Sequence, residues 1–167
     1  MDCHRAALRH HNLILVTTIK PASADFLLEA DMPARRRDFI LYIGDTFTRQ
    51  VNLKSGPDAD IADFTGEFIV YNDDDTALIT ANSAETGLNL HNGYIDIEIN
   101  EAITAALSVA GIPRTGTIVE PAPDCEIPFS DVGNLARYAL RVTSPSGVVT
   151  TLLVGTVGVV ESIVEAA

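Results

Sequence analysis

The amino-acid sequence predicts an all-β fold: an immunoglobulin-like or jelly-roll-like antiparallel sandwich with one short helix. Short segments alternate apolar and polar residues, as strands with one buried face do. Turn-forming residues separate these segments about every ten residues, a spacing that is typical of a sandwich. The chain also ends in two β-rich runs, 136–143 and 148–160, joined by the turn Ser144-Pro145-Ser146-Gly147.

This closing hairpin is predicted in most detail. Pro145 fixes φ at the second turn position and Gly147 suits the fourth position, as a type I turn requires. In the return strand, Gly155 and Gly158 indicate bulges or close contacts within the sheets rather than the approach of a ligand. A domain that ends this way is built as a scaffold, which favours a structural role over a catalytic one.

The body of the chain contains six further strand candidates. They are 39–43, 47–53, 67–71, 77–80, 88–90 and 94–99. The last of them alternates most regularly, with three isoleucines on one face and Asp96, Glu98 and Asn100 on the other. In 47–53, Arg49 shares a face with Phe47, Val51 and Leu53, whereas 67–71 is apolar on both faces, as in a strand covered on two sides.

Residues 101–110 break the strand pattern. Their apolar positions and alanines predict a short amphipathic helix, and Gly111-Ile112-Pro113 ends it. Residues 114–131 are rich in proline and are expected to form a surface loop, with a short strand at 117–120.

Charge divides the chain into two parts. The net charge of the whole chain is −12. Residues 1–37 have a net charge of +2, and residues 38–167 have a net charge of −14. An acidic body repels phosphate backbones, which excludes nucleic acid as an expected partner and favours docking against a basic surface. We therefore expect an N-terminal arm or extension, 1–37, and one β-sandwich domain, 38–167.

The N-terminal extension admits alternative interpretations. Residues 13–19 have β-propensity and are expected to add to a sheet edge on assembly. Met32 followed by Pro33 is also a plausible start, so residues 1–31 are either an arm or sequence upstream of the true start. Leu13–Val16 resembles the apolar part of a signal peptide, but it is about half the usual length. No apolar run approaches the ~20 residues of a membrane span, so no membrane association is expected.

Clusters of ligand-type side chains give no predicted site. Six aspartates suggest calcium, namely Asp58, Asp60, Asp63, Asp73, Asp74 and Asp75, but their spacing does not match an EF-hand loop. His4, His10 and His11 lie close in sequence without the further ligands of a zinc site. Cys3 and Cys125 are expected to be reduced thiols. We therefore predict no metal and no cofactor.

Catalytic patterns are equally weak. A Cys–His dyad would require Cys125 to meet His91, the only histidine of the main body, and the sequence does not show that they meet. The chain lacks a Gly-x-Ser-x-Gly motif and a glycine-rich phosphate loop. It has no Trp and only four Tyr to build the aromatic platforms that carbohydrate-binding domains present. We predict no catalytic residues and no enzymatic activity.

The order of these signals resembles a family of tailed-phage virion proteins, the small β-domains of baseplate upper proteins and tail-fibre anchors. The matching pieces, within residues 38–160, are 43–47 with its strand to Leu53, 63–71, 93–99, 103–107, 138–142 and 146–157. The resemblance implies an immunoglobulin-like or jelly-roll-like sandwich that attaches parts of a virion, with no catalytic residues. Residues 1–37 lie outside it, and 112–135 is longer than the pattern.

The expected function follows from that resemblance. It is a non-enzymatic adaptor, attachment or decoration protein of a phage tail, baseplate or capsid, located in the virion and partnered by other virion proteins in a symmetric homo-oligomer. Expected contact segments are the N-terminal arm, Arg35–Arg37 and the loop 114–131. The alternative is a secreted or surface binding module that uses Ca²⁺ or glycan. A third hypothesis is a hydrolase that joins His91 to Cys125 or to an acid pair.

Overall fold

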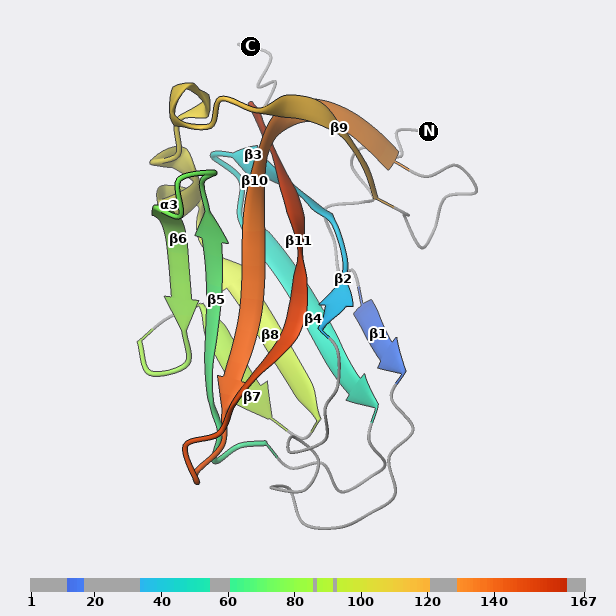
Figure 1. Ribbon diagram of the computed structural model, residues 1–167, viewed down its shortest axis with the longest axis vertical. Helices are drawn as coiled ribbons and strands as arrows, with labels where there is room; N and C mark the ends of the chain where they lie inside the picture. The colour runs from blue at the N-terminus through green and yellow to red at the C-terminus, as the bar shows by residue number, and fades with distance from the viewer. Residues whose placement is uncertain are drawn as a thin grey trace.

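Two β-sheets are stacked face to face in the computed structural model of the chain (Figure 1). The structure describes residues 12–16, 34–54, 61–85, 87–91, 93–120 and 129–161. The strands are β1 (Asn12–Val16), β2 (Arg35–Arg36), β3 (Phe39–Ile43), β4 (Phe47–Lys54), β5 (Thr65–Tyr71), β6 (Ala77–Asn82), β7 (Leu88–His91), β8 (Tyr94–Ile99), β9 (Thr115–Glu120), β10 (Phe129–Thr143) and β11 (Val149–Glu161). One short α-helix, α3 (Glu101–Ala105), follows β8. The predicted all-β sandwich with one short helix is confirmed.

The strand order is of the immunoglobulin type. One sheet has the order β1-β4-β8-β7, and the other has β2-β11-β10-β5-β6, with β3 also on β11 and β9 also on β10. The chain crosses between the sheets from β1 to β2, from β3 to β4, from β4 to β5, from β6 to β7 and from β8 to β9, while four antiparallel pairs of consecutive strands stay within a sheet, namely β5–β6, β7–β8, β9–β10 and β10–β11. This places β4-β8-β7 opposite β11-β10-β5-β6, the arrangement of immunoglobulin domains.

Both sheets are completed at one edge by parallel strands from the N-terminal part of the chain. β1 pairs with β4 in parallel, and β2 and β3 pair in parallel with β11. The sequence predicted an antiparallel sandwich, and the interior strand pairs are antiparallel. Among the described strands, the structure differs from this prediction only in the parallel strands at the edges. Parallel neighbours need a long connection, and the segments that precede β4 are far enough from their partners to supply it.

An aromatic cluster fills the space between the sheets. The ring of Phe39 lies 4.9 Å from that of Tyr138 and 5.9 Å from that of Phe47, and Phe68 lies 5.4 Å from Tyr138. The three isoleucines of β8 are buried beside them, which confirms the predicted alternation of that strand. The core therefore joins strands from both sheets and from both halves of the chain.

The predicted helix over 101–110 is too long. The helix ends at Ala105, and a separate 3₁₀ turn covers Val109–Gly111. Asn100 caps its start by accepting a hydrogen bond from the amide of Ile103 at 3.0 Å. The alanines of this segment are exposed, and Ile103 and Leu107 are only partly buried against the core, so little buried apolar surface holds a longer helix together. No helix in the described part of the chain is long and apolar enough to cross a membrane.

The predicted loop 114–131 is partly a β-ribbon. β9 confirms the short strand expected at 117–120, and it pairs with residues 129–134 of β10, which begins seven residues before the predicted start at 136. The remaining loop residues, 121–128, lie outside the described residues. Ile118 of β9 packs where Gly158 leaves room on β11, and this contact explains why the segment is ordered as a strand.

The strand expected at 67–71 begins two residues earlier, at Thr65. Phe68 and Val70 are buried, while Ile69 and Tyr71 are half-buried, so only one face is fully covered and the prediction of two covered faces is wrong. Gly66 lies within this strand, where a Cβ would come within 2.5 Å of the Leu88 side chain. That glycine is required by sheet-to-sheet contact rather than by a turn.

Candidate functional site

The outer face of the β4-β8-β7 sheet carries a polar cluster. Gln50 of β4 donates a hydrogen bond from Nε2 to Oδ1 of Asp96 on β8, at 2.8 Å. The other carboxylate oxygen of Asp96 lies 2.6 Å from Nε2 of His91 on β7. The His91 ring also stacks on Tyr94, with ring centroids 5.9 Å apart. Three adjacent strands thus hold one carboxylate in a fixed orientation.

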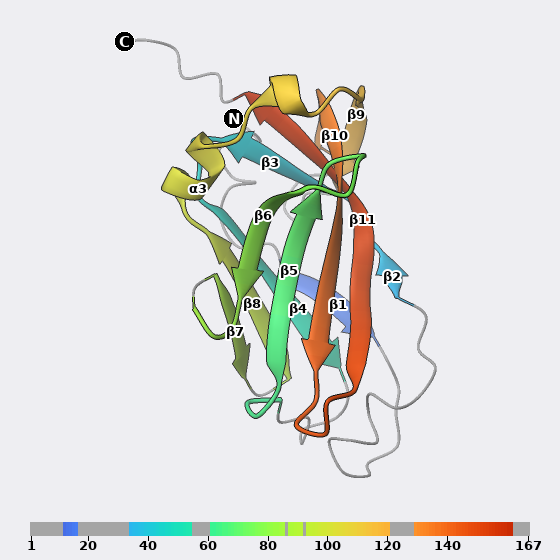
Figure 2. The ribbon, with the colours of Figure 1, turned by 60° about the vertical axis from the view of Figure 1, so that its left-hand side comes forward.

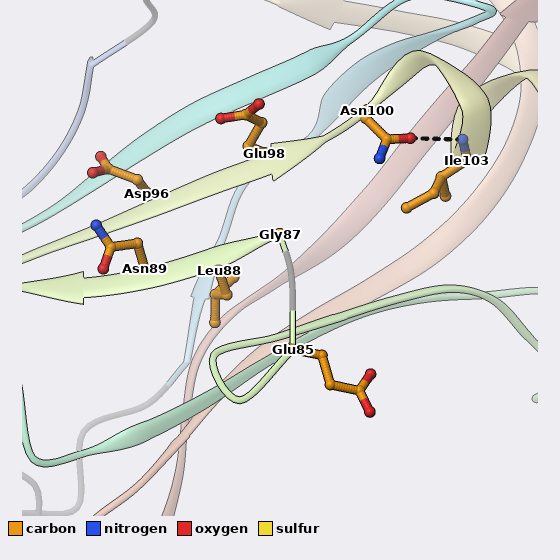
Figure 3. A pocket seen from close by; sticks show the side chains of 8 residues that line it. All are labelled: Glu85, Gly87, Leu88, Asn89, Asp96, Glu98, Asn100 and Ile103. Carbon is orange, nitrogen blue, oxygen red and sulfur yellow. Dashed lines mark hydrogen bonds between the residues drawn. The ribbon is translucent and has the colours of Figure 1, made fainter.

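A hollow of about 510 Å³ lies beside this cluster (Figure 3). Its lining residues come from β7, β8 and the segments next to them: Glu85, Gly87, Leu88, Asn89, Asp96, Glu98, Asn100 and Ile103. Asp96 and Glu98 project from the same face of β8 (Figure 3). With three carboxylates and two amides, the hollow is suited to accept hydrogen bonds from a cationic or hydroxylated group.

The predicted acidic cluster at 73–75 is a β-hairpin turn between β5 and β6. Oδ1 of Asp74 accepts a hydrogen bond from the amide of Thr76 at 2.9 Å, and this bond lowers the pKa of Asp74. Asp75, at a φ of 65°, pairs with Arg137 at 2.8 Å. These carboxylates orient the turn and the neighbouring strand β10. Within the described residues, no three His, Cys, Asp or Glu side chains lie close enough to hold a metal ion.

Several sequence candidates lie outside the described residues. These are Cys3, His4, His10, His11, Asp58, Asp60 and Cys125. The zinc hypothesis, the Cys125–His91 dyad and the link between Asp63 and its acidic neighbours are therefore untested. His91 itself is described, and its partner is Asp96.

Side-chain alternation on β7 and β8 is a signal in the sequence for the polar cluster. Asn89 and His91 lie on one face of β7, and Tyr94, Asp96 and Glu98 lie on one face of β8, each alternating with apolar residues on the other face. Because His91 pairs with Tyr94 across the hairpin, Asp96 is its diagonal neighbour on the same face. The contribution of Gln50 depends on the pairing of β4 with β8, a contact between segments 46 residues apart.

The described parts of the predicted contact segments lie at edges of the sandwich. Arg35 and Arg36 form β2, an edge strand, and the Arg36 guanidinium lies 3.8 Å from the Asp38 carboxylate with its side chain largely exposed. On the β9–β10 ribbon, Val119 and Val132 are 55% and 68% exposed. Figure 2 shows this ribbon at the upper end of the molecule, on the side opposite α3.

The geometry thus offers three surfaces: the edge formed by β1 and β2, the β9–β10 ribbon, and the hollow on the β7–β8 hairpin. The first two use backbone and apolar groups, and the third uses carboxylates and amides. No protein-family model matches the chain, and a search of the curated proteins gave no match.

Proposed function

We propose that this chain is a non-enzymatic structural protein of a tailed-phage virion, an adaptor, attachment or decoration component of the tail, baseplate or capsid. One observation carries the proposal: the N-terminal segments β1, β2 and β3 complete the edges of both sheets as parallel strands. A second support is the resemblance of residues 38–160 to the attachment domains of virion proteins.

Edge strands suit assembly because their backbone groups can pair with another chain. In this chain the outer edges of β4 and β11 pair with segments at or near the N-terminal extension rather than with strands joined to them by tight hairpins. An extension that binds sheet edges is a device for tying one body to another. An immunoglobulin-like sandwich supplies a rigid body for it to bind.

The distribution of charge along the chain also supports docking onto another protein. The body from Asp38 onward carries −14, and the extension before it carries +2. The hollow on β7 and β8 adds three carboxylates to that acidic surface. Basic protein surfaces, rather than phosphate backbones, are the partners that such a body attracts.

Particles assembled without this chain test the proposal. Negative-stain images should show the loss of one defined feature of the tail, baseplate or capsid, and supplying the chain in trans should restore it. Mass spectrometry of purified normal particles should detect the chain as a stoichiometric component. Intact particles in its absence, or purified particles that do not contain it, contradict the virion role.

The hollow favours a second candidate, a surface module that binds glycan. Its amides and carboxylates, beside the stacked rings of His91 and Tyr94, offer hydrogen-bonding groups and an apolar ring face to sugar hydroxyls and C–H groups. Titration of neutral oligosaccharides, followed by amide NMR, should then shift Asn89 and Glu98 before other residues.

A further inference from the structure

The N-terminal strand β1 is attached to the sandwich through a single strand. Its five residues pair in parallel with β4, from Asn12 opposite Gln50 to Val16 opposite Lys54. β4 is its one pairing partner among the described strands. Residues 17–34 connect it to β2, which lies at the edge of the opposite sheet.

β4 needs this strand. Its other edge is taken by β8, which pairs with residues 47–52. Without β1, residues 50–54 would form an open edge next to an apolar core, and such an edge invites pairing with another chain. The requirement is for a strand of this sequence in this register, and any copy of the chain can supply it.

The connection is long enough for a neighbouring copy to supply it. Eighteen residues, 17–34, can extend over about 60 Å. The eight residues of β4 span only about 27 Å. A β1 strand can therefore reach β4 of an adjacent sandwich as well as its own.

Pairing within one chain and pairing between copies use the same backbone hydrogen bonds, so effective concentration decides between them. In a symmetric particle, neighbouring copies are held at a local concentration comparable with that of a tethered segment. The basic extension is also attracted to every acidic body around it, whereas the bodies repel each other.

We propose that, in the assembled state, residues 12–16 of one copy pair with β4 of the next copy, so that the extension links the sandwiches head to tail. The partner is a second copy of this chain, and this exchange rests on the proposed assembly function. Each copy gives one strand and accepts one, so the contacts form a ring or an open row according to the rotation between copies.

Disulfide trapping in the full-length chain tests the exchange. Cys3 and Cys125 are first replaced by Ser, and Ile14→Cys and Asn52→Cys are then made in separate proteins, because these two positions are register partners. Mixed at high concentration, incubated to permit exchange and oxidised, they should give a disulfide-linked dimer. The control mixes Ile14→Cys with Thr80→Cys, an exposed position on β6 of the other sheet.

The expected result is a yield of linked dimer roughly tenfold above that of the Thr80 control, since proximity in register raises the effective thiol concentration. The double variant, Ile14→Cys with Asn52→Cys in one chain, should give a ladder of linked oligomers. Intrachain disulfide alone in the double variant, with no dimer in the mixture, overturns the exchange. No disulfide in either sample also overturns it.

This experiment is separable from the test of the virion role. If particles lose a feature without the chain but no linked dimer forms, the structural role stands and the strand pairs within its own copy. If linked dimers form but particles are intact, strand exchange stands without the virion role. Ile14→Pro, which removes one backbone donor from β1, should in addition shift light-scattering mass toward the monomer.

Discussion

The hydroxyl of Tyr138 donates a hydrogen bond to the backbone carbonyl of Arg37 at 2.8 Å, across 101 residues of sequence. The contact passes beside Gly155, where a Cβ would meet both the Arg37 carbonyl and the Tyr138 ring. The Arg37 amide also donates to the carbonyl of Val154 at 3.0 Å. The segment between β2 and β3 is thus held by hydrogen bonds to both β10 and β11.

Replacing Tyr138 by Phe should lower the free energy of unfolding by about 1 kcal/mol, the net contribution of a typical hydrogen bond. The ring stays in place against Phe39 and Phe68, so packing is preserved. Urea unfolding, followed by circular dichroism, measures the loss. A variant as stable as the wild type would show that water replaces the hydroxyl at the Arg37 carbonyl.

Alkaline pH should destabilise the protein through the same residue. Burial, and then the charge of Asp38, raise the pKa of Tyr138 above the ordinary tyrosine value. The stability that Tyr138 contributes is therefore complete below about pH 10, the pKa of an unfolded tyrosine, and is lost as pH rises through the higher folded pKa. The free energy of unfolding is measured in urea between pH 9 and pH 12 for the wild type and for Tyr138→Phe. The loss of stability that comes from Tyr138 should appear only in the wild type.

Gly155→Ala should destabilise the protein by about 3 kcal/mol, because the new methyl group meets the backbone of Arg37, which cannot rotate away. Gly111→Ala is the matched control: a Cβ there has open space, and the change should stay within about 0.5 kcal/mol. Thermal unfolding of both variants measures the difference. Equal effects would contradict the close approach at Gly155.

Asp74 should titrate below the ordinary aspartate range. The amide and hydroxyl of Thr76 hold its carboxylate in the ionised form and lower its pKa. The turn's contribution to stability is thus present above the unfolded aspartate pKa and is lost as pH falls through the lower folded value. Carboxyl ¹³C NMR titration measures the midpoint. Thr76→Val, which removes the hydroxyl but keeps the amide, should raise it part of the way.

Arg49→Lys should cost about 1 kcal/mol of stability despite keeping the charge. The guanidinium carbon of Arg49 lies 4.9 Å from the Phe47 ring centroid and 5.7 Å from that of Phe39. A planar guanidinium stacks on rings in a way that an ammonium does not. A double-mutant cycle with Phe47→Leu measures the interaction free energy between the Arg49 guanidinium and the Phe47 ring. Additive effects of the two substitutions would show that ring contact contributes nothing.

Some features could be predicted from the sequence because they are local. β3 begins and ends with its apolar run and β8 with its apolar alternation, and the closing turn has Gly147 at a φ of 88°, as its place in the turn requires. Arg49 was predicted on the same face of its strand as Phe47, and its guanidinium packs over the Phe47 ring. A period of two along a strand fixes which side chains share a face, whatever the strand pairs with.

Other features depend on contacts that no local pattern records. The ribbon 115–120 with 129–134 follows from packing of Ile118 over Gly158, and the helix ends early because its alanines meet no core. The hydrogen bond from Gln50 to Asp96 exists only because β4 pairs with β8. The assignment of residues 1–37 as an arm stays a prediction, although 12–16 and 35–36 lie on sheet edges.

The sequence by itself determined the class of this protein, since alternating apolar residues and frequent turns can bury a core only as layered strands. The tertiary structure alone decided which strands became neighbours and in which direction they run, including the parallel edges at β4 and β11. The reason is physical: side-chain alternation is set within a few residues, whereas strand pairing is set by packing between segments as distant as Arg37 and Tyr138.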